Sequence, residues 1–198
     1  IMRNVGENLL GLIEENSTVL TQCYGETIIG ALIAVAKEKN KNFKVICAET
    51  RPFLQGARLT ASCFAEKDFD TTVITDNMVA DTMNRGKIQL FTSAADSITE
   101  DGCVINKVGT FQIALIADHF NIPYYVTGIP DKGKKTANDV KIEIRDPEHV
   151  ISMHGIIHTY DGVKGWYPSF DCTPTEYVTG VVTDRGIFKS TKLNDYFE

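Results

Sequence analysis

Polar side chains that can do acid–base chemistry follow several of the short apolar segments in this sequence. Cys23, Arg51 and Asp96 each come shortly after such a segment. In an open parallel α/β sheet the carboxyl ends of the strands meet at one edge, and ligands bind there. If these segments are strands of one such sheet, a thiol, a guanidinium group and a carboxyl group gather at that edge. This combination is typical of a polar pocket rather than of a packing surface.

Cys23 and Asp96 are the two candidates for proton transfer. Cys23 precedes a glycine-containing turn and the start of a predicted helix, whose N–H groups would favour the thiolate and lower the pKa of the thiol. Asp96 lies at the end of a predicted strand, where a carboxyl group can act as a general acid or base. Each position also has a structural interpretation: a buried small apolar side chain for Cys23, and a helix cap or a solvated turn residue for Asp96.

A third candidate site is the segment 106–110, which contains Asn106 and Lys107 and directly precedes a predicted helix. A lysine and free backbone N–H groups at a helix entrance form an anion site, and phosphate is a natural ligand for it. An ordinary capped helix start is the alternative. The sequence contains no G-x-x-x-x-G-K-[ST] motif and no G-x-G-x-x-G after the first strand, so nucleotide binding has no direct support.

The elements that must position these residues alternate between strand and helix. β-Branched and apolar runs of three to seven residues predict strands, and amphipathic or alanine-rich runs of about ten residues predict helices. The strands are 18–21, 44–48, 71–75, 87–93, 123–127 and 181–183, and the helices are 5–13, 28–37, 55–65, 78–84 and 110–120. This alternation predicts an α/β fold with a Rossmann-like, doubly wound parallel sheet covered by helices on both faces.

Several other elements are predicted from local residue types. The pair 76–77 is expected to cap the helix 78–84. Beyond Gly128 the pattern is weaker: we expect a solvated loop over 129–138 and a short edge strand over 141–145. We also expect a helix over 173–179, with Thr173 as its N-cap and Pro174 at its first position, and a terminal helix or tail over 190–197.

Composition limits the classes of protein to which the chain can belong. It has 198 residues, with 20 Lys and Arg against 26 Asp and Glu, and a formal net charge of −6. This length suits one domain, and the acidic balance without a basic block argues against a nucleic-acid surface. No apolar run is long enough to span a bilayer, so we expect no membrane partner.

Cysteine and histidine spacing gives little support for a metal or for disulfides. The five cysteines are widely spaced with no C-x-x-C, which indicates reduced thiols and a cytoplasmic location. His154 and His158 are four residues apart, but Gly155 and two isoleucines disfavour a helix that would bring them together. We therefore expect neither a metal nor a cofactor.

Several ordered blocks of the chain resemble the S-methyl-5-thioribose-1-phosphate isomerases. This group is part of a superfamily that also contains ribose-1,5-bisphosphate isomerases and the alpha, beta and delta regulatory subunits of translation initiation factor eIF-2B. The resemblance extends from Thr21 to Gly186. The blocks are 49–61 (ETRPFLQGARLTA), 74–78 (ITDNM), 95–96, 105–110 (INKVGT), 170–171 and 173–174.

The resemblance implies roles for particular residues. Cys23 matches the catalytic cysteine and Asp96 the catalytic aspartate, while Gln55, Asn106 and Lys107 match positions that contact substrate. The implied reaction converts methylthioribose 1-phosphate, a small phosphorylated sugar, to methylthioribulose 1-phosphate in methionine salvage. We assign Cys23 as proton acceptor and Asp96 as proton donor; hydride transfer from C2 to C1 is the alternative.

The chain also departs from the pattern of these isomerases. Cys23 is followed by Tyr-Gly-Glu rather than by Asn-Ala-Gly and a longer loop, and Ser97 follows Asp96 where an arginine is usual. The helical N-terminal domain of the family has no counterpart here. We expect 1–198 to be one α/β catalytic domain, with 1–16 as a helix leading in, and we expect Lys107, helix ends and Arg51 to bind the phosphate.

Two alternative functions remain. One is a ribose-1,5-bisphosphate isomerase, which would need a second phosphate site. The other is a non-catalytic regulatory or sugar-phosphate-binding subunit like those of eIF-2B. The resemblance also implies a homodimer joined through the α/β domain, and the aromatic C-terminal third, including Trp166 and Tyr167, is compatible with an interface or with a core.

Overall fold

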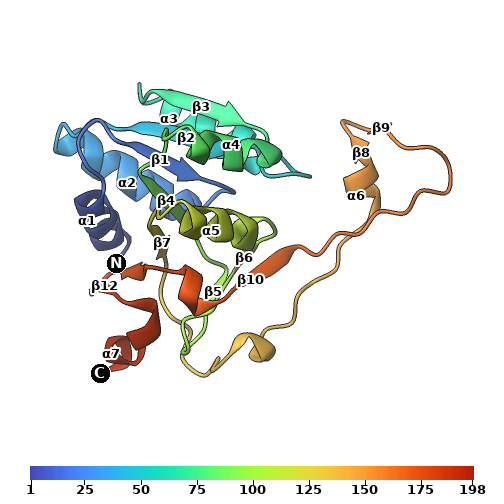
Figure 1. The fold of residues 1–198 in the computed structure, drawn as a ribbon. Helices are drawn as coiled ribbons and strands as arrows, with labels where there is room; N and C mark the ends of the chain where they lie inside the picture. The colour runs from blue at the N-terminus through green and yellow to red at the C-terminus, as the bar shows by residue number, and fades with distance from the viewer.

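The computed structural model describes residues 1–198 and is built around a seven-stranded sheet (Figure 1). The strand order is β12-β11-β7-β4-β1-β2-β3, and every neighbouring pair is parallel except β11 and β12. This confirms the predicted doubly wound α/β fold. The strands are β1 (Thr18–Thr21), β2 (Lys44–Ala48), β3 (Thr71–Ile74), β4 (Leu90–Ala94), β7 (Tyr124–Thr127), β11 (Gly180–Thr183) and β12 (Gly186–Phe188).

The order of the strands reverses between β1 and β4. The chain first builds outward from β1 through β2 to β3, and it then returns to the other side of β1 to build β4, β7 and β11. The loops that follow β1 and β4 therefore leave the sheet in opposite directions, and a crevice opens between them. In doubly wound sheets this crevice is where ligands bind.

Helices cover both faces of the sheet, as the sequence predicts. One face packs α1 and α2 in an apolar cluster that includes Leu9, Leu32 and Phe43. The other face packs α4 and α5 around Phe91 and Tyr124, whose rings stack 4.3 Å apart. The helices are α1 (Met2–Leu12), α2 (Glu26–Glu38), α3 (Ser62–Ala65), α4 (Val79–Asn84), α5 (Thr110–His119), α6 (Glu148–Ile151) and α7 (Asn194–Phe197).

A second, three-stranded antiparallel sheet lies beside the main one and was not predicted. Its order is β10-β6-β5, formed by β5 (Ser97–Ile98), β6 (Val104–Lys107) and β10 (Phe170–Thr173). The predicted helix 173–179 is wrong: Thr173 ends β10, and only a 3-10 turn, Thr175–Tyr177, follows. The residues of β10 extend because they pair with β6 some 65 residues away, with Phe170 opposite Lys107. Local residue types do not report such a partner.

Residues 129–169, here called the arm, connect β7 of the main sheet to β10 of the second sheet (Figure 1). The predicted edge strand 141–145 is wrong, because only Ile144 forms an isolated bridge, to Pro168. The arm carries α6 and a small hairpin of β8 (Ser152–Met153) and β9 (Ile156–Ile157). Its two limbs are joined by hydrogen bonds from the Arg145 N–H to the Tyr167 carbonyl and from the Ser169 N–H to the Glu143 carbonyl.

Other predicted details also differ from the structure. Asp76 does not cap α4; its carboxylate accepts the N–H groups of Thr50 and Arg51 at 2.8 and 2.7 Å. A π-helical turn, Gly56–Ala61, precedes α3 where one continuous helix was expected, and the C-terminus forms a 3-10 turn before the short α7. None of the helices is long and apolar enough to cross a membrane.

Close packing beside β2 makes Gly56 a sensitive position. A Cβ added there would lie 1.9 Å from the carbonyl oxygen of Ala48 and 2.7 Å from the Thr50 hydroxyl oxygen. We expect Gly56→Ala to lower the free energy of unfolding by about 3 kcal/mol or more, because the backbone of β2 cannot move aside. Gly30→Ala, in open space on α2, should instead raise it by about 0.5–1 kcal/mol. Urea unfolding of both variants checks the pair; equal stabilities would contradict the packing argument.

Candidate active site

A cavity of about 280 Å³ opens at the crevice between β1 and β4. It brings together four of the six residues predicted from sequence: Cys23, Asp96, Asn106 and Lys107. The other lining residues are Gln22, Tyr24, Gly25, Ala94, Ala95, Arg145 and Phe170. The side chains come from the loops after β1 and β4, from β6 and β10, and from the arm.

The loop after β1 holds Cys23 in one backbone conformation. Its φ angle is 62°, in the left-handed region that a non-glycine residue adopts only when its surroundings require it. Its N–H donates to the hydroxyl of Thr50 at 2.8 Å, and its carbonyl accepts the hydroxyl of Thr60. Because Thr50 is itself held by Asp76, the loop after β1 is tied to the loops after β2 and β3.

The electrostatic environment of Cys23 differs from the one predicted. Burial raises the pKa of the thiol, and the charge of Asp96 raises it further. The N–H of Tyr24, the ammonium of Lys107 and the amide of Gln55 oppose this shift but do not overcome it. The predicted lowering of the pKa is therefore wrong: the helix-start effect is present only as the Tyr24 N–H and is weaker than the cost of burying a thiolate.

Asp96 lies where β4 gives way to the second sheet. Its N–H donates to the carbonyl of Ile105 at 3.0 Å, and the residue is exposed and lines the cavity. Partial desolvation raises the pKa of the carboxyl group, while Lys107 and Arg145 hold the increase back. The carboxylate accepts no hydrogen bond from a helix N–H, so the helix-cap interpretation does not apply.

Lys107 is the most enclosed charged group of the site. It lies in β6, rather than in a helix-entrance loop, and is 4 % exposed. Its Nζ lies 4.7 Å from the centre of the Phe170 ring, a favourable cation–π distance. Burial and the nearby charge of Arg145 lower the pKa of Lys107.

Asn106 is fixed by a buried hydrogen-bond network around Thr110, the first residue of α5. The Asn106 amide donates to the Thr110 hydroxyl at 3.1 Å, and that hydroxyl donates to the carbonyl of Lys107 at 2.7 Å. The amide of Gln22 also donates to the Thr110 hydroxyl and, at 3.3 Å, to the same carbonyl. The network therefore locks β1, β6 and α5 together at the cavity floor.

The remaining two predicted residues have different fates. Gln55 lies against Cys23, and its buried Oε1 has no hydrogen-bond partner. An unpartnered buried acceptor is costly, and Gln55 does not line the cavity. Arg51 does not line the cavity. Its guanidinium donates to the carbonyls of Val150 and Ser152, both at 3.3 Å, and thereby ties the arm to the loop after β2.

Arg145 is the charged residue of the cavity that sequence reasoning missed. It belongs to the arm, in a stretch that was expected to be a short edge strand. Its guanidinium lies 5.8 Å from the centre of the Phe170 ring and pairs with Glu143 at 2.9 Å. It lies close enough to Asp96 to lower the pKa of that carboxyl group, in the absence of an arginine at position 97. The only signal of this in the sequence was Ser97, which stands where related isomerases usually have an arginine. It indicated that a cation beside Asp96 would come from another part of the chain.

Asp171, on β10, fixes the start of α5 next to the site. Its carboxylate accepts the Gly109 N–H at 2.6 Å and the Phe111 N–H at 3.2 Å, so it caps α5 from another element. Gly109 connects β6 to α5 with a φ of 103°, a backbone conformation that glycine adopts without strain. Burial raises the pKa of Asp171 to about 6 despite these hydrogen bonds.

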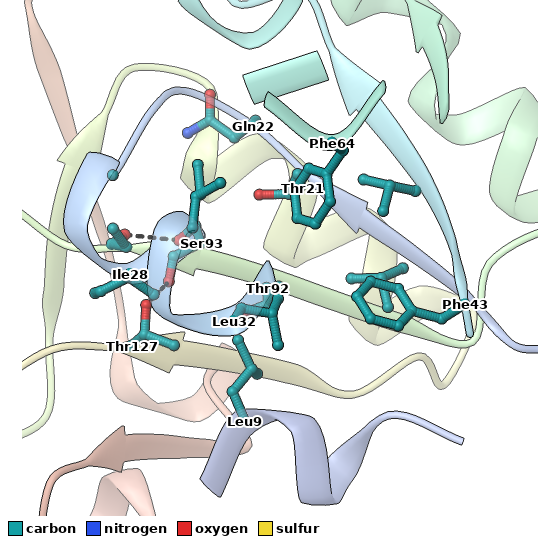
Figure 2. Close-up of a pocket in the computed structure, with 15 residues that line it drawn as sticks. Leu9, Thr21, Gln22, Ile28, Leu32, Phe43, Phe64, Thr92, Ser93 and Thr127 are labelled. Carbon is teal, nitrogen blue, oxygen red and sulfur yellow. Dashed lines mark hydrogen bonds between the residues drawn. The ribbon is translucent and has the colours of Figure 1, made fainter. Parts of the chain in front are cut away.

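A second, small cavity of about 30 Å³ lies beneath the loop of Cys23, between the main sheet and the helices α1 and α2 (Figure 2). It shares Gln22, Gly25 and Ala94 with the larger cavity. Figure 2 shows Gln22 at one end and Leu9 at the other. Its volume corresponds to about one or two water molecules, so it cannot hold a sugar, and the larger cavity is the candidate active site.

Fold and cavity together define an α/β protein with a polar cavity at the switch point of a doubly wound sheet, and a thiol and a carboxyl group both line this cavity. Comparison with known proteins agrees with this class. The chain belongs to the initiation factor 2 subunit family, whose model matches residues 1–190.

Two curated relatives are named as sugar-phosphate isomerases. The 5-deoxyribose 1-phosphate isomerase of Clostridium botulinum (strain Hall) is 41 % identical over 199 residues. The methylthioribose-1-phosphate isomerase of Geobacillus thermodenitrificans is 39 % identical over 197 residues. Both matches cover 94 % of this chain and 56 % of the relative, so the chain spans about half the length of these relatives.

Solved structures of similar proteins share the fold. The delta subunit of translation initiation factor eIF-2B from A. fulgidus matches with a TM-score of 0.87 and 36 % identity, over 94 % of this chain and 57 % of that chain. The 5-methylthioribose 1-phosphate isomerase of Pyrococcus horikoshii matches with a TM-score of 0.87 and 30 % identity, over 99 % of this chain and 57 % of that chain.

The raised pKa of Asp171 gives a pH-dependent stability. The folded state binds this proton more tightly than the unfolded chain, so the contribution of Asp171 to stability falls as pH rises from about 4 to about 6. We expect the stability of the parent protein relative to Asp171→Asn to decrease by about 2 to 3 kcal/mol between pH 4 and pH 7. Urea unfolding of both proteins at the two pH values measures this difference; an increase with pH would contradict the assigned direction.

Proposed function

We propose that this chain carries the catalytic site of a sugar-phosphate isomerase that converts an aldose 1-phosphate into the corresponding ketose 1-phosphate. The observation that carries this proposal is the shared cavity of Cys23 and Asp96, with the buried Lys107 in its wall. The isomerase names of curated relatives at about 40 % identity support it. The unit 1–198 is then a catalytic α/β unit, in which α1 packs against α2 in the core beside β1.

The substrate is a ribose 1-phosphate with an apolar group at C5. S-methyl-5-thioribose 1-phosphate, in methionine salvage, and 5-deoxyribose 1-phosphate both fit this description, and the relatives carry both names. The apolar residues that line the cavity include Ala94 and Ala95, which suit a methyl or methylthio group. A ribose 1,5-bisphosphate would bring a second dianion against these apolar side chains.

The chemistry needs an acid and a base because the phosphate ester at C1 blocks simple opening to a free aldehyde. The Asp96 carboxyl donates a proton to the ring oxygen as the bond from C1 to that oxygen breaks. The Cys23 thiolate removes the proton from C2, and the electron pair of that bond forms the C1=C2 bond of an enol. The thiol then returns its proton to C1 while the hydroxyl at C2 gives its proton to the Asp96 carboxylate, which leaves a ketone at C2 and restores both groups.

The pKa shifts suit these roles unequally. A raised pKa favours the protonated Asp96 that a donor requires, whereas a raised pKa leaves only a small fraction of Cys23 as thiolate. The Tyr24 N–H, Lys107 and the Gln55 amide are the groups that stabilise the thiolate. Hydride transfer from C2 to C1 of the opened sugar is the alternative route, and it would not need the thiolate as a base.

Turnover of three sugars tests the proposal directly. We expect conversion of methylthioribose 1-phosphate or 5-deoxyribose 1-phosphate, with little conversion of ribose 1,5-bisphosphate. Cys23→Ser and Asp96→Asn should each reduce kcat by at least 100-fold, because each removes a proton-transfer group, with unchanged circular dichroism and thermal melting. Rates within a few-fold of the parent in either folded variant would exclude its assigned role.

The same assay in D₂O separates the two chemical routes. Proton transfer through Cys23 places solvent deuterium at C1 of the product, whereas direct hydride transfer leaves C1 free of it. Cys103→Ser, which changes a buried thiol outside the cavity, is the matched control and should keep the parent rate.

A non-catalytic subunit is the second candidate function. The structural likeness to the eIF-2B delta subunit of A. fulgidus favours it. The joint presence of Cys23 and Asp96 in one cavity argues against it, since a binding site has no need for this acid–base pair. Calorimetric binding of the 1-phosphates without turnover by the same preparation would favour the subunit over the isomerase.

We also propose that the chain forms a homodimer through the arm, which exposes unusually many large apolar side chains. They include Ile144 (60 % exposed), Ile156 (63 %), Ile157 (57 %), Tyr160 (88 %) and Trp166 (74 %). Such a concentration of apolar surface marks an association site.

Light scattering after size-exclusion chromatography tests this dimer. We expect twice the chain mass for the parent, and the chain mass for Ile156→Glu combined with Trp166→Glu, because each new carboxylate would be buried in the contact. Ile187→Glu, at an exposed position on β12, is the matched control and should remain dimeric. A monomeric parent at 100 µM would contradict the proposal.

A further inference from the structure

The candidate cavity has more positive than negative charge. Lys107 and Arg145 both line it, and Asp96 is its only carboxyl group. Lys107 has no ion-pair partner within 4.0 Å although it is 4 % exposed. A buried cation without a counter-charge is costly, so the cavity is suited to an anion that would neutralise it.

The two cations lie near the same aromatic ring. The Lys107 ammonium lies 4.7 Å and the Arg145 guanidinium 5.8 Å from the centre of Phe170. Burial and then the charge of Arg145 lower the pKa of Lys107, so the two like charges repel one another. A dianion placed between them would convert this repulsion into attraction on both sides.

Arg145 is held in a way that leaves part of its guanidinium available. Its backbone N–H is bonded to the Tyr167 carbonyl at 2.9 Å, which fixes where the side chain begins. Its Nε donates to Glu143, and its terminal nitrogens donate no hydrogen bond to a carboxylate. Glu143 first, and the neighbouring Tyr167 hydroxyl as well, raise the pKa of Arg145. The two terminal nitrogens of a guanidinium group match two oxygens of a phosphate, a geometry that lysine cannot provide.

We propose that Arg145, carried by the arm, binds the phosphate of the substrate together with Lys107. This deepens the proposed function and rests on it. Arg51 is then a positioning residue: it does not reach the phosphate but anchors the arm through the carbonyls of Val150 and Ser152. The phosphate is recognised by a residue that is distant in sequence from every other member of the site.

Replacement of the guanidinium tests the proposal. We expect Arg145→Gln to raise KM for the 1-phosphate, and the inhibition constant of inorganic phosphate, by about 10- to 100-fold, with a smaller change in kcat. Arg145→Lys should recover part of the loss, because it restores the charge without the paired geometry. Arg58→Gln is the matched control. Arg58 is exposed and lies outside the cavity, so this substitution makes the same change in net charge and should leave both constants unchanged.

A second readout separates phosphate binding from a merely structural role. Because the charge of Arg145 lowers the pKa of Asp96, Arg145→Gln should shift the acidic limb of the kcat/KM profile to higher pH. If Arg145→Gln keeps the KM, the phosphate inhibition constant and the acidic limb of the parent protein, the proposed role of Arg145 is wrong. The proposed isomerase function would not be affected by that result.

Calorimetric titration of the full chain with inorganic phosphate keeps the two proposals distinguishable. If no sugar is turned over but phosphate binds to the parent and not to Arg145→Gln, the anion site stands and the isomerase proposal fails. If phosphate binds equally to both proteins, or to neither, the role of Arg145 is wrong whatever the activity assay gives.

Discussion

The reversal of strand order between β1 and β4 is the constraint on which the rest of the molecule depends. Two parallel neighbours whose following loops turn away from each other leave a crevice that no helix fills. Cys23 ends up on one side of it and Asp96 on the other because each follows one of these two strands. Thr50 and Asp76, from the next two strands outward, then fix the loop of Cys23 by hydrogen bonds. The positions of the thiol and the carboxyl group are therefore consequences of topology rather than of local sequence.

The second constraint is the balance between burial and charge. Burial raises the pKa of both Cys23 and Asp96 and lowers that of Lys107, so each group is pushed toward its neutral form. Lys107 partly reverses this shift for the thiol, and Lys107 and Arg145 partly reverse it for the carboxyl group. These three groups are partly desolvated, so an anion bound among them would shift the pKa of all three. In the proposed isomerase, binding of the phosphate would therefore be coupled to the protonation states of Cys23 and Asp96.

The arm connects this electrostatic site to the surface. It supplies Arg145 to the cavity and presents exposed isoleucine and aromatic side chains outside it. Its attachment to the body depends on few contacts, among them the Arg51 hydrogen bonds and the packing of Phe53 against His149 and Tyr167. The same segment thus contributes to the proposed phosphate site and to the proposed contact with a second copy of the chain.

The main sheet and most of its helices could be predicted from the sequence, because the apolar runs of β1 and β2 and the helix that begins at Thr110 have strong local patterns. Cys23 and Asp96 could be predicted because residues at the strand ends of one parallel sheet share an edge, and Asn106 and Lys107 because they precede a predicted helix. Features that depend on distant partners could not be predicted in this way. β10 is extended because it pairs with β6, and Asp76 holds a loop instead of capping a helix. The thiol has a raised rather than a lowered pKa because burial outweighs the local N–H group. Arg145 reaches the cavity, and Arg51 does not, because the arm folds back across residues that lie about 100 positions away in the chain.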